Sequence, residues 1–320
     1  MNLSIVIVTY NSPEWTARCL DALTGDAAPT GAYEIVVVDS GSEPAARDAL
    51  RARAGQARIV LVDGNIGFGN GCNLGVRHST GERVLLLNPD AVALPSAIDA
   101  LVAFDRAHPE HGIVGGRTLR PDGTVDPSSC WAKPTLWSLF CFATGLSTVF
   151  KRSRWLDPES MGRWERDSVR EVDVVTGCLL LARREVYDAL GGFDSDFFLY
   201  GEDADLSLRA RAAGWRPAIT PDAAVTHAVG ASSASRGEKH ILVLTGKATL
   251  ARKHRRGVNR ALAIALLQAG VGLRALPERL RHKENPDWLP AWRERARWRR
   301  GFPPGPAPEY PVEILEGAPA

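Results

Sequence analysis

Short, continuous runs of aliphatic residues recur along the first ninety residues of the chain, and amphipathic segments lie between them. The runs occupy residues 3–10, 34–39, 58–62 and 83–88. A run of this length without alternating polar positions is typical of a strand buried on both faces of a parallel sheet. Ser12 and Pro13 mark the start of the first intervening helix, as a cap and a proline at the first helical position. The alternation predicts an α/β fold with a Rossmann-like, doubly wound, mostly parallel sheet.

The pattern is less regular after residue 90. We expect a helix over 91–108, a strand over 112–117, a hairpin turn at 121–123, loops and short helices over 128–169, a buried strand group over 172–181 and a short helix over 183–190. An amphipathic helix then begins after Gly201 and ends at Gly214. Strand segments lead from Trp215 to His227.

A helical extension is expected from residue 236 to the end. Its first helix covers about 238–256, and an almost wholly apolar segment follows at 261–276. That segment is shorter than the roughly 20 residues that cross a bilayer, so we expect a buried helix, a contact with a second subunit, or a helix lying in the membrane interface. From Pro303 onward the chain is proline-rich, which predicts a loose end.

Charge is distributed unevenly along the 320 residues. The net charge is only +2, but residues 252–300 hold 14 basic and 4 acidic side chains. An acidic body with a basic tail predicts an anionic partner at the C-terminal end. We favour a membrane surface, because no nucleic-acid-binding motif accompanies the basic residues. The five cysteines show no CxxC spacing and Met1 leads straight into a strand, so we expect a cytoplasmic protein with reduced thiols and no signal peptide.

Polar residues follow the predicted strands. Tyr10, Asn11 and Asp39 lie where strand ends are expected, and ligands of doubly wound sheets bind beyond the carboxyl ends of strands. Asp90 follows Pro89, which stops a strand, and a carboxylate there can bind a divalent cation on phosphate oxygens. The alternatives are that Asp39 caps a turn and that Asp90 is a turn residue.

A glycine-rich run, GNIGFGNGCNLG, follows the third predicted strand at residues 64–75. Its five glycines and three asparagines let the backbone approach a ligand and offer amide donors to a phosphate or a sugar hydroxyl. The run resembles a dinucleotide fingerprint, but it follows the third strand, whereas a nicotinamide-type fingerprint should follow the first. The helix after it is expected from Cys72 to His78.

Three carboxylates, Glu202, Asp203 and Asp205, open the helix after Gly201. Acidic residues in a first turn are favoured by the helix dipole, so a capped helix is one interpretation. A cap needs a single carboxylate, however, whereas a site that removes a proton beside a bound cation needs several. His227 ends a strand, before Gly230, Ser232 and Ser233. A histidine in this place is either structural or part of a loop over a site.

Taken together, residues 3–256 resemble the family-2 glycosyltransferases, inverting enzymes with the GT-A fold. The resemblance rests on SIVIVTYNS, EIVVVDSGS, GNIGFGNGCNLG, LLLNPDA, VTGCLLLARREVYDALGGFD, FFLYGEDADLSLRARAAGW and His227 with the GASS that follows. The hairpin PDGTVDPSS and the NPD sequence are most similar to the bacterial rhamnosyltransferase-type branch. This resemblance implies a donor half (1–117), an acceptor-binding and catalytic half (118–235) and a helical basic extension (236–320).

The resemblance also implies roles for single residues. The donor-binding residues would be Thr9, Tyr10, Asn11, Asp39, Asn65, Gly67, Asn70, Asn88 and Asp90. Asp90 matches the last carboxylate of the DxD motif that binds Mg²⁺ or Mn²⁺, and His227 matches a further metal contact. Asn88 replaces the first carboxylate of that motif, which leaves the identity of the metal open.

On the acceptor side, Asp203 matches the catalytic base, with Glu202 beside it. Asp205 and Gly177 are assigned to acceptor binding. A carboxylate enclosed in this way removes the proton of a sugar hydroxyl as the bond forms, while the cation stabilises the departing diphosphate.

The resulting hypothesis is an inverting hexosyltransferase that moves a sugar, L-rhamnose as the best match, from a nucleotide-sugar donor to a glycan or polyprenyl-linked acceptor. It would work in the cytoplasm, peripherally on the inner face of the cell membrane, with a homo-oligomer as an open alternative. Three other interpretations are a transferase for another sugar, a pyrophosphorylase-like enzyme and a non-catalytic nucleotide- or glycan-binding protein. The second would need a GxGxR-type loop after the first strand, and the third would have no use for Asp90 and Asp203 together.

Overall fold

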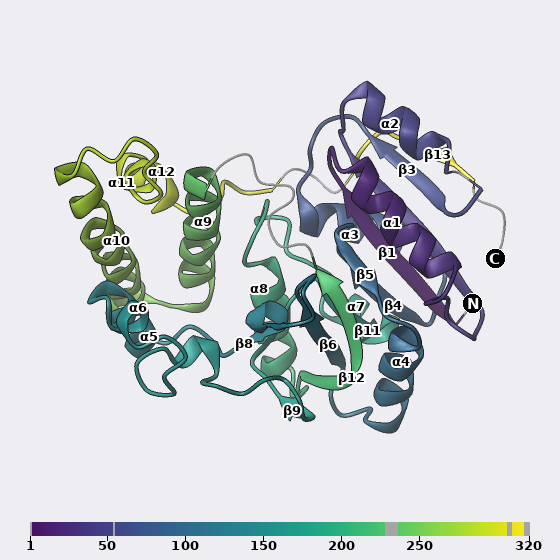
Figure 1. Cartoon of the computed structure of the whole chain (residues 1–320), viewed down its shortest axis with the longest axis horizontal. Helices are drawn as coiled ribbons and strands as arrows, with labels where there is room; N and C mark the ends of the chain where they lie inside the picture. Colours follow the sequence, from purple (N-terminus) through teal and green to yellow (C-terminus); the bar gives the residue numbers. More distant parts are fainter. Residues whose placement is uncertain (1, 54, 228–235, 306–308, 317–320) are drawn as a thin grey trace.

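A central mixed sheet organises the molecule (Figure 1). The computed structural model describes residues 2–53, 55–227, 236–305 and 309–316. Within them the sheet follows the order β13-β3-β2-β1-β4-β11-β6-β12-β5, with β7 paired to β6 and β9 to β12. Its strands are β1 (Leu3–Thr9), β2 (Tyr33–Ser40), β3 (Arg58–Val62), β4 (Arg83–Leu87), β5 (Ala91–Ala93), β6 (Ile113–Leu119), β7 (Val125–Asp126), β9 (Arg170–Glu171), β11 (Leu179–Arg183), β12 (Ala218–His227) and β13 (Val312–Leu315).

The strands β3, β2, β1 and β4 are parallel, as predicted, and are almost wholly buried. Helices α1 (Pro13–Thr24), α2 (Pro44–Arg51) and α4 (Ala97–Ala107) supply side chains to the core on one face of the sheet. Helices α3 (Phe68–Arg77), α7 (Arg184–Ala189) and α8 (Glu202–Ala212) supply the core on the other face. The predicted doubly wound α/β class is therefore confirmed. The predicted side-chain cap of α1 is not formed, because the Ser12 hydroxyl donates to the Tyr10 carbonyl instead.

Helix α3 begins at Phe68, four residues before the predicted start. Eight of the twelve residues of the glycine-rich run, 68–75, are therefore helical, and two of its glycines serve packing against β1. A Cβ atom on Gly71 would lie 2.7 Å from Val8 Cγ1, and one on Gly75 would lie 2.4 Å from Val6 Cγ1. The helix can approach β1 this closely only because these positions carry no side chain.

Two predicted elements are corrected around residue 90 and residue 176. The expected helix over 91–108 begins only at Ala97, because residues 91–93 form β5 against β12. The expected strand group over 172–181 is two strands in two sheets. β10 (Val174–Val175) pairs with β8 (Cys130–Trp131), and β11 belongs to the central sheet, so the chain between them turns at residues 176–178.

The C-terminal extension forms a helical layer with its own core beside α8. It contains α9 (Arg236–His254), α10 (Gly257–Leu280), α11 (Leu289–Arg293) and α12 (Arg295–Trp298), and α5 (Leu136–Ala143) with α6 (Leu146–Val149) packs against it. The predicted loose end is wrong for residues 312–315, which add β13 to the edge of the sheet beside β3. The proposed functional division at residue 117 stays a prediction, since β6, β11 and β12 continue one sheet.

Candidate active site

The carboxyl ends of β1 and β2 bring together the first group of predicted donor residues. Thr9 and Asp39 are opposite each other in the parallel register. Asp39 has no exposed surface, and its Oδ1 accepts from the Ser42 amide at 3.2 Å. Arg47 Nε lies 3.0 Å from Asp39 Oδ2, as an ion pair without the alignment of a hydrogen bond. Asp39 therefore does cap the turn after β2. Arg47 already compensates the negative charge of Asp39 before any nucleoside binds.

Thr9 and Asn11 shape the turn after β1. The Thr9 hydroxyl lies 2.8 Å from the Thr16 hydroxyl in the core. Asn11 has φ +50°, in the left-handed region, and its side-chain oxygen accepts from the Glu43 amide at 2.7 Å. Between them, the Tyr10 side chain is 45% exposed. Tyr10 directly follows the residue that pairs with Asp39, and its exposed ring is accessible to a ligand.

The start of the glycine-rich run is fixed by hydrogen bonds to its own backbone. Asn65 Oδ1 accepts from the Gly67 amide at 2.9 Å, and Asn70 Nδ2 donates to the Ile66 carbonyl at 3.0 Å. Gly67 has φ +82°, and a Cβ atom there would lie 2.1 Å from the carbonyl oxygen of Phe198. Only glycine fits this position, because the segment preceding α8 lies directly against it. The predicted donor run and the predicted acceptor segment are thus in contact.

Asp90 and His227 are neighbours, as the predicted metal site requires. β5 pairs with β12 so that Ala91 faces His227, and His227 Nε2 lies 3.2 Å from Asp90 Oδ1. Burial disfavours charge on His227, but its interactions with Asp90 and Cys178 outweigh this and raise its pKa to about 10. Residues 228–235, including Gly230, Ser232 and Ser233 of the predicted loop, lie outside the described residues.

The turn at residues 176–178 joins the two predicted halves of the site. Asp203 Oδ2 accepts from the Gly177 amide at 3.3 Å. The backbone carbonyl of the next residue, Cys178, accepts from the Asn88 amide at 3.1 Å. Cys178 also interacts with His227. Asp203 and the Asp90–His227 pair therefore both contact one short backbone segment, although more than a hundred residues separate Asp90 from Asp203 in the chain.

Glu202 and Asp203 have different surroundings although they are adjacent. Glu202 is 4% exposed, and its Oε2 is buried without a hydrogen-bond partner. Burial and the nearby charge of Asp203 raise the pKa of Glu202. Burial also raises the pKa of Asp203, although the amides of Ala204 and Gly177 stabilise its charged form. Glu202 packs beside Gly69 of α3, so of the two it is Asp203 that lies against the turn shared with the metal residues.

Asp205 is fully buried in an ion cluster. Its carboxylate lies 2.7 Å from Arg209 Nε, 2.9 Å from Lys253 Nζ and 2.8 Å from His254 Nε2. Burial opposes its charge, but these three partners lower the pKa of Asp205 to about 2. All its surface is occupied, so contact with an acceptor would require the cluster to open. Its local role is to fasten α8 to α9.

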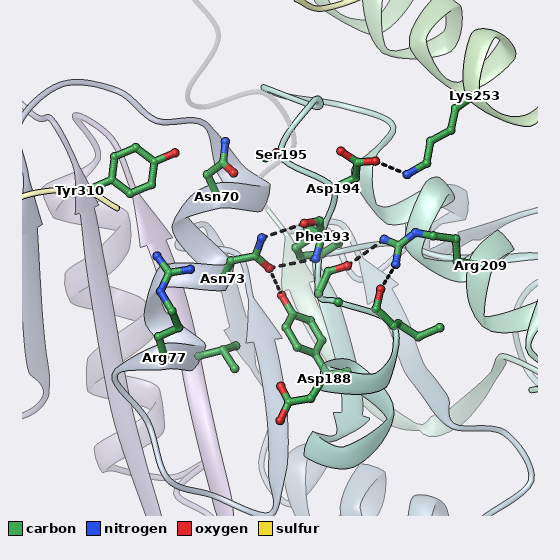
Figure 2. Close-up of a pocket in the computed structure, with 15 residues that line it drawn as sticks. Asn70, Asn73, Arg77, Asp188, Phe193, Asp194, Ser195, Arg209, Lys253 and Tyr310 are labelled. Carbon is green, nitrogen blue, oxygen red and sulfur yellow. Dashed lines mark hydrogen bonds and ion pairs between the residues drawn. The ribbon is translucent and has the colours of Figure 1, made fainter. Parts of the chain in front are cut away.

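A cavity of about 530 Å³ lies between α3, the segment at 187–195 and α8 (Figure 2). Asn73 lines this cavity and joins two of its sides. Its side-chain oxygen accepts from the Tyr187 hydroxyl at 2.7 Å, and its side-chain nitrogen donates to the Phe193 carbonyl at 2.8 Å. The cavity touches Asn70 of the predicted donor group but none of Asp39, Asp90 or Asp203. We therefore do not place the chemistry there.

Three partners of the site were not predicted from the sequence. Arg47 neutralises Asp39 from the next helix, Cys178 touches His227, and His254 holds Asp205 from the tail. Arg47 could have been anticipated as the basic residue of a helix that follows Asp39 directly. The others depend on contacts between distant segments, which leave no local signal.

Known proteins that are similar to this chain belong to glycosyltransferase and glycan-biosynthesis families. Residues 4–190 match the family model described as glycosyl transferase family 2. An N-acetylglucosaminyl-diphospho-decaprenol L-rhamnosyltransferase of Mycobacterium tuberculosis is 31% identical over 236 residues, which cover 70% of this chain and 75% of that protein. The O-antigen biosynthesis protein RfbC of Myxococcus xanthus is 29% identical over 240 residues, covering 72% of this chain but 17% of RfbC.

A solved structure resembles the fold over most of its length. The mannosyltransferase PcManGT from Pyrobaculum calidifontis, in complex with GDP-Man and Mn²⁺, superposes with a TM-score of 0.55 at 19% identity. The match covers 92% of this chain and 87% of PcManGT. At this identity the likeness concerns the fold alone.

Proposed function

The chain belongs to glycosyl transferase family 2 and is a glycosyltransferase, and from this premise we propose that it is an inverting enzyme that transfers a sugar from a nucleoside-diphosphate donor to a lipid-linked glycan. The GT-A fold expected from the resemblance is confirmed by the parallel sheet and by the solved structure that it matches.

The observation that carries the proposal is the turn at residues 176–178. Asp203 contacts this turn through the Gly177 amide, and the Asp90–His227 pair contacts it through Cys178. Inversion needs a base on one side of the anomeric carbon and a charge-stabilising group on the other, at the leaving diphosphate. Both centres contact residues of this one short segment, which supports a base and a cation acting on the same substrate.

Asp90 and His227 fit a divalent cation. Their facing atoms are 3.2 Å apart, close to the roughly 3 Å between adjacent ligands of an octahedral ion with bonds of about 2.1 Å. The carboxylate suits Mg²⁺ or Mn²⁺. His227 would ligate the cation through Nε2 only as a neutral imidazole, so binding would displace the proton that its raised pKa favours. A bound cation would supply positive charge for the diphosphate. The one group of three candidate ligands found among the described residues, within 108–111, precedes β6 at the opposite end of the sheet.

Asp203 acts as the base in this proposal. Burial raises its pKa and so increases its affinity for the proton of the attacking hydroxyl, while the Gly177 and Ala204 amides keep the carboxylate oriented. Glu202, whose pKa is also raised, holds its proton next to Asp203 and so avoids two adjacent buried charges. Asp205 positions the helix that carries both.

On the donor side, Tyr10 and Asp39 hold the nucleoside, and Thr9, Asn11, Asn65, Gly67, Asn70 and Asn88 shape the backbone around it. L-rhamnose is the proposed sugar, because a relative 31% identical to this chain carries rhamnosyltransferase in its name. The same name includes a diphospho-decaprenol, which supports a polyprenyl-linked acceptor here, and hence action at the inner face of the cell membrane.

A panel of nucleotide sugars with Mg²⁺ or Mn²⁺ tests the proposal. The true donor should raise the melting temperature of the protein in the presence of metal, because a ligand that binds only the folded state stabilises it. With a polyprenyl-diphosphate-sugar acceptor, that donor should release its nucleoside diphosphate and give a product of inverted anomeric configuration by NMR. Retention of configuration, or no transfer from any donor that binds, would refute it.

A further inference from the structure

Large apolar side chains are exposed mainly at one end of the molecule. Of the thirteen that are exposed in the described part of the chain, ten lie in two segments, residues 137–155 and α10. The first group contains Trp137, Phe140, Val149, Phe150 and Trp155, and the second contains Val258, Leu262, Leu273, Leu276 and Leu280. We call these ten residues the apolar face.

The α10 residues of this face form one stripe. At about 100° per residue, positions 258, 262, 273, 276 and 280 fall within roughly 60° of one another around the helix. The opposite side of α10 carries Leu267 and Val271 into the core shared with α9 and α11. Helix α10 is thus half packed and half unpartnered among the described residues. By length and composition alone it could cross a membrane, and 28% of its most apolar window is buried.

The two segments are joined into one rigid surface. Gly270 lets α10 approach α5 so closely that a Cβ atom there would lie 2.4 Å from the Phe142 ring. Arg274 then clamps the two segments, donating to the Phe142 carbonyl at 2.8 Å and to the Thr148 hydroxyl at 2.6 Å. Leu273 touches the turn between α5 and α6 at Gly145. Figure 1 shows α5, α6 and α10 side by side at the end of the molecule away from β1 and β2.

The aromatic residues of the face are held at its surface rather than folded inward. Trp137 stacks on Phe140 with ring centroids 5.5 Å apart, and its indole N–H donates to the Trp155 carbonyl at 2.7 Å. The Trp155 side chain itself is 72% exposed. Tryptophan placed in this way is typical of the boundary between water and lipid.

Charge identifies the partner. Residues 137–155 hold three basic and no acidic side chains, and residues 255–281 hold six basic and one acidic. We infer that the apolar face docks on an anionic lipid surface, with α10 and the aromatic residues at the level of the headgroups. The exposed basic side chains next to them in the chain, Lys151, Arg154 and Arg279, would lie against lipid phosphates. In a dimer formed through this face, the positive charges of the two copies would repel each other, which disfavours a second copy of the chain as the partner.

Docking here would hold the acceptor side of the site near the lipid. β8 leads into α5, and its partner β10 leads into the turn that carries Gly177. This consequence rests on the proposed function, but the docking itself does not. Vesicle binding without donor or acceptor therefore tests the inference separately from the transfer reaction.

The experiment is flotation of the full-length protein with vesicles of phosphatidylcholine alone or mixed equally with phosphatidylglycerol. The docking variant carries Trp155→Glu and Leu276→Glu. The matched control carries Val169→Glu and Ile314→Glu, two exposed positions away from the face with the same change of charge. We expect wild type and control to float with the anionic vesicles, less so at high salt, and the docking variant to lose at least about tenfold in partitioning.

Equal flotation of the docking variant, or no flotation of the wild type with anionic vesicles, would overturn the inference. So would a wild-type dimer in sedimentation that the docking substitutions dissociate while lipid binding is absent. Both substituted side chains are exposed, so the melting temperature should stay near that of the wild type. If the double variant does not fold, Trp155→Glu and Leu276→Glu are compared singly with Val169→Glu.

Discussion

Replacing Asp205 with asparagine should destabilise the protein, because the structure places this carboxylate in a buried ion cluster. The carboxylate is fully buried among Arg209, Lys253 and His254, and its pKa falls from 3.8 to about 2. A shift of this size corresponds to about 2 kcal/mol of folding free energy at neutral pH. Asparagine would also remove the charge that Arg209 faces in this cluster, while Lys253 keeps its ion pair with Asp194, and breaking a buried pair costs about 3–5 kcal/mol. We therefore expect a loss of about 3 kcal/mol.

Thermal unfolding at pH 7 measures this loss, which should lower the melting temperature by about 5 °C. The folded-state pKa of Asp205 is below its unfolded value, so the stabilisation is present above pH 4 and disappears as pH falls toward 2. The difference between wild type and Asp205→Asn should shrink over that range. The matched control is Asp222→Asn, at an exposed position. A variant as stable as the control at pH 7 would refute the argument.

Three further predictions concern the site. Gly67→Ala should weaken donor binding at least about tenfold by isothermal titration, because it combines φ +82° with a contact to Phe198; unchanged binding would contradict the role given to this glycine. Glu202→Gln should be less sensitive to alkali than wild type. The raised pKa of Glu202 means that the stability it contributes is complete at low pH and is lost as pH rises through the folded-state pKa. Unfolding in urea from pH 6 to 9 should therefore show the variant becoming more stable relative to wild type. Parallel pH profiles of the two proteins would contradict this. Asp90→Ala should remove the metal-dependent part of donor binding by about 10- to 100-fold while Glu171→Ala, an exposed control, retains it; equal binding by both would exclude Asp90 as a ligand.

The strands of the first half could be predicted because a strand buried on both faces is a continuous apolar run. β1 to β4 follow the expected ranges to within one or two residues. Residues 91–93 were assigned to a helix because three residues of β5 carry no period of their own, and pairing with β12 decides their conformation. β13 was missed for the same reason: its partner β3 is about 250 residues away.

The contacts that connect the candidate site residues could not be predicted from the sequence. Asp39, Asp90 and His227 were identified from strand ends, and the structure places Asp90 beside His227. Adjacency in the sequence suggested one shared site for the three carboxylates of α8, with Asp203 and Glu202 catalytic and Asp205 binding the acceptor. The structure separates them, because a helix turns by about 100° per residue: Asp203 meets the turn at Gly177, while Asp205 turns to the tail.

The most direct measurement is transfer by Asp203→Asn with its donor affinity determined in parallel. Asparagine keeps the size of the side chain but cannot accept the proton of a sugar hydroxyl. Donor affinity should stay within about twofold of wild type while transfer falls about 10²- to 10⁴-fold, the usual contribution of a general base. If Asp203→Asn transfers sugar at the wild-type rate, Asp203 is not the base, and the arrangement around residues 176–178 does not carry the reaction.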